Sequence, residues 1–317
     1  MIRLVLTGFA ALLGLAFGSF LNVCLTRWPA GESVVKPRSH CRQCNRTLIW
    51  WENVPLASWL VLRGRCRTCE TAIGWRYPLV ELAVGGLWAL TAWRTFGYVS
   101  LLNGLYAENR LTNLLLTPSG SLQILLSMLG LMFFFWLVIA LGVLDAEHLW
   151  LPNWLTLPGI VAGFFLYVVE LLLQVRLDAI SGLPLTAGFE EVPFGIYGVV
   201  LKRLAAILAA ALLVLLIRWT YWLIRRQEGM GLGDAKLMAM LAAWLGLPGA
   251  LLSFVLAVCM GAAFAFVILA QPRARRGAKS WATTPLPFGT FLCIAGLVSA
   301  LWGGQLINVY LHWSGLR

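Results

Sequence analysis

Long apolar runs recur along the whole chain and restrict its fold more than any other feature. They lie at about 4–25, 78–97, 122–144, 151–173, 196–224, 235–249, 250–270 and 285–311. A helix needs about 20 apolar residues to cross a bilayer, and within a bilayer only helices and closed barrels satisfy every backbone polar group. With 60% hydrophobic and only 12% charged residues, the chain is not an ordinary soluble domain. The sequence therefore predicts an all-α membrane protein with about eight transmembrane helices.

The first apolar run divides the chain into three expected parts. It is too long for a signal peptide and a basic loop follows it, so we expect a retained helix. The parts are transmembrane helix 1 at 1–25, a loop domain at 26–77, and a polytopic membrane domain with helices 2–8 at 78–317. Pro248-Gly249 is expected to mark a tight turn between the sixth and seventh helices. No internal repeat is evident.

Basic residues predict the orientation of the helices. The net charge of +11 could suggest nucleic acid in a soluble protein, but in a membrane protein a basic cytoplasmic side and anionic lipid headgroups explain it. We therefore expect membrane lipids as partners and no nucleic acid. The 26–77 loop, with nine basic and three acidic residues, should be cytoplasmic and the N-terminus outside. Counting crossings puts the basic segments at 225–226 and 273–279 on the same side.

Two CxxC pairs in the loop form the most specific local pattern. Cys41 and Cys44 are separated from Cys66 and Cys69 by 21 residues. Each pair supplies two thiolates from one tight turn, which suits tetrahedral zinc. A closed four-sulfur site has no open position for water, so the metal should fold the loop and take no part in catalysis. Disulfides are the competing interpretation, and the expected reducing side of the membrane weighs against them.

Other polar and aromatic residues near the loop have more than one interpretation. The segment at 48–60 is aromatic and apolar, which fits either a platform on the membrane surface or a groove for a partner peptide or cofactor. Glu81 lies one turn inside the second helix, where a capping role competes with a catalytic one. Asn22 lies in the first apolar run, so it should hydrogen-bond inside the bundle.

A glycine-rich acidic turn at 228–236 lies between two apolar runs. A carboxylate at mid-bilayer costs about 2.5–3.5 kcal/mol on insertion scales, so Asp234 either faces water in a turn at the membrane edge or has a role or a partner. Gly231 and Gly233 would let another helix approach closely. The predicted topology puts Asp145 on the same membrane face. Two adjacent carboxylates share a proton, so that one activates water while the other protonates the scissile carbonyl.

Several motifs together resemble the type IV prepilin peptidases, the Gly-x-Gly-Asp class of membrane aspartic peptidases. The resemblance spans about 14–291. Its motifs are Gly18-Ser19-Phe20-Leu21-Asn22-Val23, Gly31-Glu32-Ser33-Val34-Val35, Pro37 with Ser39-His40-Cys41, the two CxxC pairs, Leu62-Arg63-Gly64-Arg65-Cys66, Arg76-Tyr77-Pro78-Leu79-Val80-Glu81, Gly229-Met230-Gly231-Leu232-Gly233-Asp234-Ala235-Lys236 and Pro287-Phe288-Gly289.

The resemblance implies a bifunctional enzyme of the bacterial inner membrane. Members cut the leader of type IV prepilins or pseudopilins after a glycine on the cytoplasmic side, and methylate the new N-terminus with S-adenosylmethionine. Their catalytic aspartates correspond to Asp145 and Asp234. Their zinc-binding loop, which marks the bifunctional members, corresponds to the four cysteines at 41, 44, 66 and 69.

Two positions depart from the family's usual pattern. Asn153 follows Leu151-Pro152 where the family commonly has aspartate, which favours Asp145 as the reactive group of its segment and leaves Asn153 as an orienting hydrogen-bond partner. Thr290 stands where the family often has proline, a change expected to be minor. Glu147 and His148 are titrating groups that we place outside the reactive pair.

Methyl transfer has the weakest sequence signal. The chain has no glycine-rich methyltransferase fingerprint after a strand, so S-adenosylmethionine is implied only by the resemblance and the retained CxxC pairs. The candidate cofactor-binding residues are Glu52, Asn53 and Glu81. Two alternative functions are a peptidase with the same aspartates but no methyltransferase activity, and a non-enzymatic scaffold of a secretion apparatus.

Overall fold

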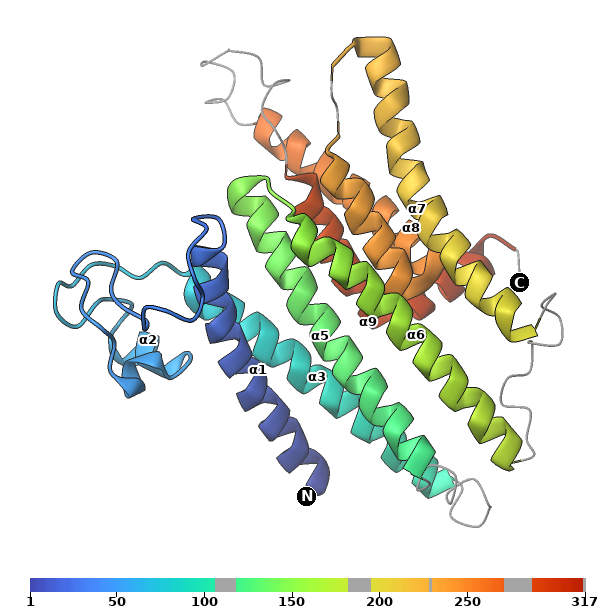
Figure 1. The fold of residues 1–317 in the computed structure, drawn as a ribbon, viewed down its shortest axis with the longest axis horizontal. Helices are drawn as coiled ribbons and strands as arrows, with labels where there is room; N and C mark the ends of the chain where they lie inside the picture. Colours follow the sequence, from blue (N-terminus) through green and yellow to red (C-terminus); the bar gives the residue numbers. More distant parts are fainter. Residues whose placement is uncertain (106–117, 182–194, 228–229, 271–286, 316–317) are drawn as a thin grey trace. The chain divides into compact units, whose positions relative to one another are not determined.

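The structure, a computed structural model, describes residues 1–105, 118–181, 195–227, 230–270 and 287–315 (Figure 1). These residues contain no β-strand, only two isolated bridges. The helices are α1 (Ile2–Arg27), the 3-10 helix η1 (Trp50–Asn53), α2 (Ala57–Val61), α3 (Arg76–Leu105), α5 (Pro118–His148), α6 (Asn153–Ser181), α7 (Gly195–Arg225), α8 (Leu232–Ala270) and α9 (Phe288–Trp313). The predicted all-α fold is confirmed.

Six of the described helices are long and apolar enough to cross a membrane: α1, α5, α6, α7, α8 and α9. The second expected span forms α3, whose hydropathy is lowered by Arg76, Glu81 and Arg94. The sixth and seventh expected spans lie together on α8, which has a kink inside it. The prediction of a helical membrane protein is confirmed, with these differences in how the spans are divided.

The kink in α8 lies at Gly246, two residues before the expected turn at Pro248-Gly249. Gly246 has φ 74° and ψ 175°, a conformation that a residue without Cβ adopts readily. Pro248 lacks an N–H, so the helix around it loses part of its hydrogen bonding. The guanidinium of Arg203 on α7 donates to the carbonyl of Ala242 at 3.3 Å, which supplies a donor beside the kink.

The chain forms two compact units. The first comprises Met1–Ala140 with Ala179–Gly182, and it holds α1, the CxxC loop and α3. The second comprises Leu141–Asp178 with Leu183–Arg317, and it holds the last two turns of α5 followed by α6 to α9. Within the second unit α7 and α9 both pack on α8.

Helix α1 packs closely on α3 through glycines one turn apart (Figure 1). A Cβ added at Gly14 would lie 2.8 Å from the Cα of Gly85, and one at Gly18 would lie 2.7 Å from the Cα of Glu81. This small-xxx-small spacing is typical of membrane helices whose backbones touch. One turn further, Asn22 Nδ2 donates to the Tyr77 carbonyl at 2.9 Å, as expected for an amide in an apolar helix.

We predict that Gly14→Ala destabilises the α1–α3 pair, whereas Gly8→Ala does not. The added methyl group at Gly14 would overlap the backbone of Gly85, at a cost of about 1–3 kcal/mol. A Cβ at Gly8, on the same helix, meets nothing within 4 Å. Thermal unfolding in detergent, followed by circular dichroism, measures both. Equal melting temperatures for the two variants would contradict close packing at Gly14.

Candidate active site and metal centre

Asp145 lies in the last turn of α5 and is 5% exposed. Its Oδ2 atom accepts a hydrogen bond from the backbone N–H of Thr290 at 2.6 Å, and the Thr290 hydroxyl lies 3.1 Å from the same oxygen. Gly289 makes this approach sterically feasible, because a Cβ there would lie 2.9 Å from the carboxyl carbon of Asp145. The carboxylate therefore lies at the N-terminus of α9, where the helix dipole favours a negative charge.

Asp234 lies in the first turn of α8 and is 7% exposed. Its Oδ2 atom accepts a hydrogen bond from the Gly231 N–H at 3.1 Å. Gly233 packs on Leu151, since a Cβ there would lie 3.0 Å from the Leu151 Cβ. The two glycines thus have different roles: Gly233 permits a close approach, and Gly231 supplies a backbone donor to the carboxylate.

The two aspartates belong to one electrostatic site in the second unit. The charge of Asp145 acts on Asp234, and both charges act on the buried thiol of Cys293 on α9. Neither aspartate forms an ion pair with a described residue. Two neighbouring buried carboxylates without a countercharge favour sharing one proton, since like charges disfavour the second ionisation.

The neighbouring polar residues Lys236, Asn153, Glu147 and His148 contact one another in two pairs. Lys236 Nζ donates to Asn153 Oδ1 at 2.5 Å. No hydrogen bond joins Asn153 to Asp145 within the described ranges, so the expected orienting contact is not observed. Glu147 and His148 lie at the end of α5, and their side chains are 3.9 Å apart.

Thr290 contacts Asp145 in a way that the sequence did not predict. It was expected to be a minor departure from the family pattern, yet it supplies both hydrogen bonds seen on Asp145 Oδ2. Proline at this position could make neither bond, because it has no N–H and no hydroxyl. The two residues are 145 positions apart in the chain, so no local pattern could have linked them.

The four loop cysteines meet in the first unit. Their sulfur atoms all lie within 4.8 Å of one another, and the Sγ atoms of Cys41 and Cys69 are 3.7 Å apart. Four thiolates bonded to zinc at about 2.3 Å would be about 3.8 Å from each other in a tetrahedron. The cluster therefore has the donor set and the size of a closed zinc site.

The protonation of these thiols also favours a cation. Hydrogen bonds from the hydroxyl and backbone of Thr71 lower the pKa of Cys69 to about 6. The pKa of Cys44 is lowered by the backbone hydrogen bond at Arg46, but burial and hydrogen bonds with the other three cysteines outweigh this and raise it to about 11. Four adjacent thiolates repel one another unless a dication balances them, so the cluster favours a bound zinc ion.

The two CxxC turns, which we call the knuckles, are copies of one local fold. In the first, Cys41 N donates to Arg46 O at 2.9 Å and Asn45 N donates to Cys41 O at 2.8 Å. The matching bonds in the second are Cys66 N to Thr71 O at 2.9 Å and Glu70 N to Cys66 O at 3.0 Å. The expectation of no internal repeat is therefore wrong at this scale. The sequence pattern that could have revealed this repeat is Cys-Arg-x-Cys followed by a tryptophan six residues after the second cysteine, which occurs in both turns.

Glu52 and Glu81 both hold the loop in place. Glu52 accepts from Arg46 Nη2 at 2.7 Å and from Ile49 N at 2.9 Å, and the Arg46 hydrogen bond lowers the pKa of its carboxyl. Glu81 Oε2 accepts from the backbone N–H of Leu56 at 2.7 Å. Glu81 therefore ties the loop to α3, an alternative to the capping role considered for it.

A cavity of about 690 Å³ lies between the loop and the ends of α1 and α3. All three candidate cofactor residues, Glu52, Asn53 and Glu81, line it. Asn22 lines it as well, and its buried Oδ1 atom has no hydrogen-bond partner within the described residues. The volume is typical of small-molecule sites, and the unpaired oxygen would suit a donor on a bound ligand.

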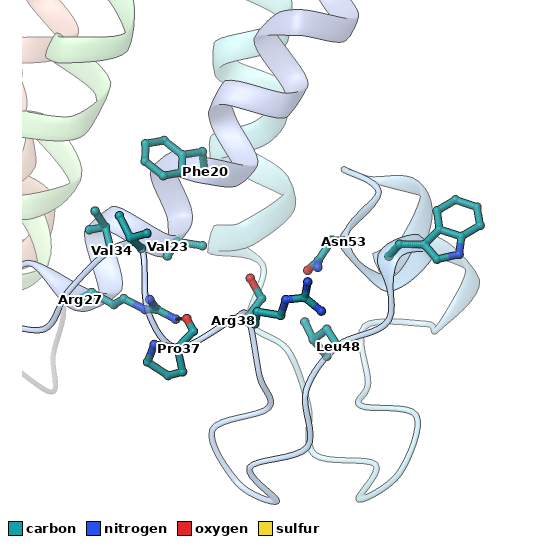
Figure 2. Close-up of a pocket in the computed structure, with 11 residues that line it drawn as sticks. Phe20, Val23, Arg27, Val34, Pro37, Arg38, Leu48 and Asn53 are labelled. Atoms are coloured by element: carbon teal, nitrogen blue, oxygen red, sulfur yellow. Dashed lines mark hydrogen bonds between the residues drawn. The ribbon is translucent and has the colours of Figure 1, made fainter.

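A smaller cavity of about 420 Å³ shares part of this wall (Figure 2). Helix α1 contributes Phe20, Val23 and Arg27, and the loop contributes residues that include Arg38 and Asn53. Arg27 is 6% exposed, and its guanidinium donates to the carbonyls of Ser33 and Pro37. Arg27 therefore fixes the path of the loop as it leaves α1.

Comparison with known proteins gives concordant matches over both units. The model of the bacterial peptidase A24 N-terminal domain matches residues 12–95, and that of the type IV leader peptidase family matches residues 132–266. A prepilin leader peptidase/N-methyltransferase of Stutzerimonas stutzeri is 33% identical, covering 97% of this chain and 94% of the relative. A relative of the same name from Pseudomonas aeruginosa is 32% identical, covering 96% of this chain and 93% of the relative. Another from Aeromonas salmonicida is 31% identical, covering 95% of this chain and 92% of the relative. No solved structure matches. The chain belongs to the type IV leader peptidase family.

Proposed function

We propose that this protein cleaves the leader of type IV prepilins or pseudopilins with Asp145 and Asp234, and methylates the N-terminus that the cut exposes. The main support for the peptidase activity is the buried pair of interacting carboxylates. One oxygen of each carboxylate accepts a hydrogen bond from a backbone N–H. The names of the relatives support both halves of the proposal. The cysteine cluster favours the bifunctional interpretation over a peptidase without methyltransferase activity.

Peptide hydrolysis by this pair needs one proton between the two aspartates. The ionised carboxylate accepts a proton from water as the water attacks the scissile carbonyl, and the protonated one donates to the carbonyl oxygen. The tetrahedral intermediate then collapses as the carboxyl group that took the proton of water donates it to the leaving nitrogen, and the other carboxylate takes back a proton from the hydroxyl group as the carbonyl re-forms. Burial of both groups excludes bulk water, which strengthens these interactions.

Methyl transfer would use the larger cavity of the first unit. S-adenosylmethionine supplies the methyl group, and its cationic amino group is a donor that Asn22 Oδ1 and the carboxylates of Glu52 and Glu81 suit. Asn53 lines the same wall. Zinc held by Cys41, Cys44, Cys66 and Cys69 would maintain this wall, since both knuckles belong to the loop that closes the cavity.

The protein is a multi-pass membrane protein, and we propose the bacterial inner membrane with the N-terminus outside. The loop with its excess of basic residues, the zinc site and both aspartates would then face the cytoplasm. Anionic lipid headgroups are the expected partners of the basic segments, in addition to the pilin substrates.

We predict that Asp145→Asn and Asp234→Asn each reduce leader cleavage by about 1,000-fold or more, because neither member of the pair works alone. Glu147→Gln, at the same end of α5, is the matched control and should cleave like the parent enzyme. Cleavage of a prepilin peptide by purified protein measures all three, with insertion checked by protease protection. Substantial cleavage by either Asn variant would remove that residue from the catalytic pair.

We predict about one zinc ion per chain, held by the four cysteines, in protein purified under reducing conditions. The adjacent thiolates require a dication, so a strong chelator should release the metal and loosen the loop. Metal analysis and limited proteolysis of the loop measure these effects. A metal-free native protein, or a disulfide between the knuckles, would rule out this site.

We predict that Cys66→Ser combined with Cys69→Ser lowers methylation of a pre-cleaved pilin peptide by at least about 10-fold, and lowers cleavage less. The second knuckle borders the cavity, whereas the aspartates belong to the other unit. Cys259→Ser, an exposed cysteine outside the cluster, is the control. An equal loss of both activities in an inserted protein would contradict this division between the units.

A further inference from the structure

We propose that Thr290 is a positioning residue that binds Oδ2 of Asp145 and leaves Oδ1 as the oxygen that exchanges the catalytic proton. The proposal rests on the proposed peptidase function. It concerns a residue outside the Gly-x-Gly-Asp turn, in the first turn of α9.

Both donors of Thr290 converge on one carboxylate oxygen. The backbone N–H lies 2.6 Å from Asp145 Oδ2 and 3.2 Å from the Pro287 carbonyl, so the shorter contact is to the aspartate. The hydroxyl lies 3.1 Å from the same Oδ2 atom. Within the described residues Oδ1 accepts no hydrogen bond. An ionised oxygen with two donors is a weaker base than its neighbour, so the proton moves at Oδ1.

The Thr290 hydroxyl has one proton and two acceptors within reach. Its oxygen lies 3.0 Å from the Gly142 carbonyl, on the helix turn that precedes Asp145, and 3.1 Å from Oδ2. While Asp145 is ionised the hydroxyl donates to Oδ2. Once Asp145 is protonated, the hydroxyl rotates to the Gly142 carbonyl without any movement of heavy atoms. The side chain thus follows the charge of Asp145 through the reaction, while the N–H holds the carboxyl group in place.

The test compares Thr290→Val, which keeps the shape and the N–H but loses the hydroxyl, with Thr290→Ser, which keeps both donors. Thr91→Val is the control, because Thr91 is buried and its hydroxyl donates to the Leu87 carbonyl of its own helix. Cleavage of a prepilin peptide by purified enzyme gives kcat and KM. We expect kcat to fall about 10-fold in Thr290→Val with KM unchanged, and to stay within about twofold of the parent in Thr290→Ser and Thr91→Val.

The outcomes separate this proposal from the peptidase function itself. If the parent enzyme cleaves and Thr290→Val has the same kcat as the parent, the role of Thr290 is overturned and the peptidase function stands. The same holds if the kcat of Thr290→Ser is as low as that of Thr290→Val. A parent enzyme that cleaves no prepilin overturns the peptidase function, and the Thr290 proposal with it. Should Thr290→Val fail to insert, Thr290→Ala replaces it, and equal kcat values for Thr290→Ala and Thr290→Ser would then overturn the proposal.

Discussion

The structure depends most on how it accommodates two carboxylates within apolar helices. Asp145 lies in the last turn of α5 and Asp234 in the first turn of α8, and they are only 5% and 7% exposed, so an ionised carboxylate at either position needs hydrogen-bond donors. Backbone N–H groups of Thr290 and Gly231 bond one oxygen of each. Such donors stabilise a carboxylate without neutralising it, so the two charges still repel each other. Sharing one proton would relieve that repulsion, and under the proposed function it would supply the site with an acid and a base.

Glycine residues allow helix backbones to approach closely, and both the carboxylate pair and the larger cavity depend on such an approach. Gly289 admits the Asp145 carboxyl group to the start of α9, and Gly233 lets the start of α8 contact Leu151. In the first unit, Gly14 and Gly18 bring α1 against α3, which carries Glu81. Glu81 then binds the loop that carries the cysteines. Close backbone approach at glycine therefore supports the carboxylate pair in one unit and the larger cavity in the other.

The sequence predicted what depends on local pattern. Apolar runs predicted the helices, and the CxxC spacing predicted that the four cysteines would meet, which the structure confirms. What it could not predict depends on contacts between distant segments. Thr290 contacts Asp145 across 145 positions, and Asn153 bonds Lys236 instead of an aspartate. The kink at Gly246 was expected two residues later, because proline and glycine mark a bend without fixing which backbone residue takes the positive φ.

The central claim is that Asp145 and Asp234 together stabilise a tetrahedral intermediate. Its most direct test is the affinity of a leader peptide whose scissile carbonyl is replaced by a hydroxyl-bearing tetrahedral carbon. The parent enzyme should bind this analogue at least about 100-fold more tightly than the unmodified peptide, as transition-state analogues do. That preference should disappear in Asp145→Asn and in Asp234→Asn, while both variants still bind the unmodified peptide. A preference that survives in either variant would contradict the account.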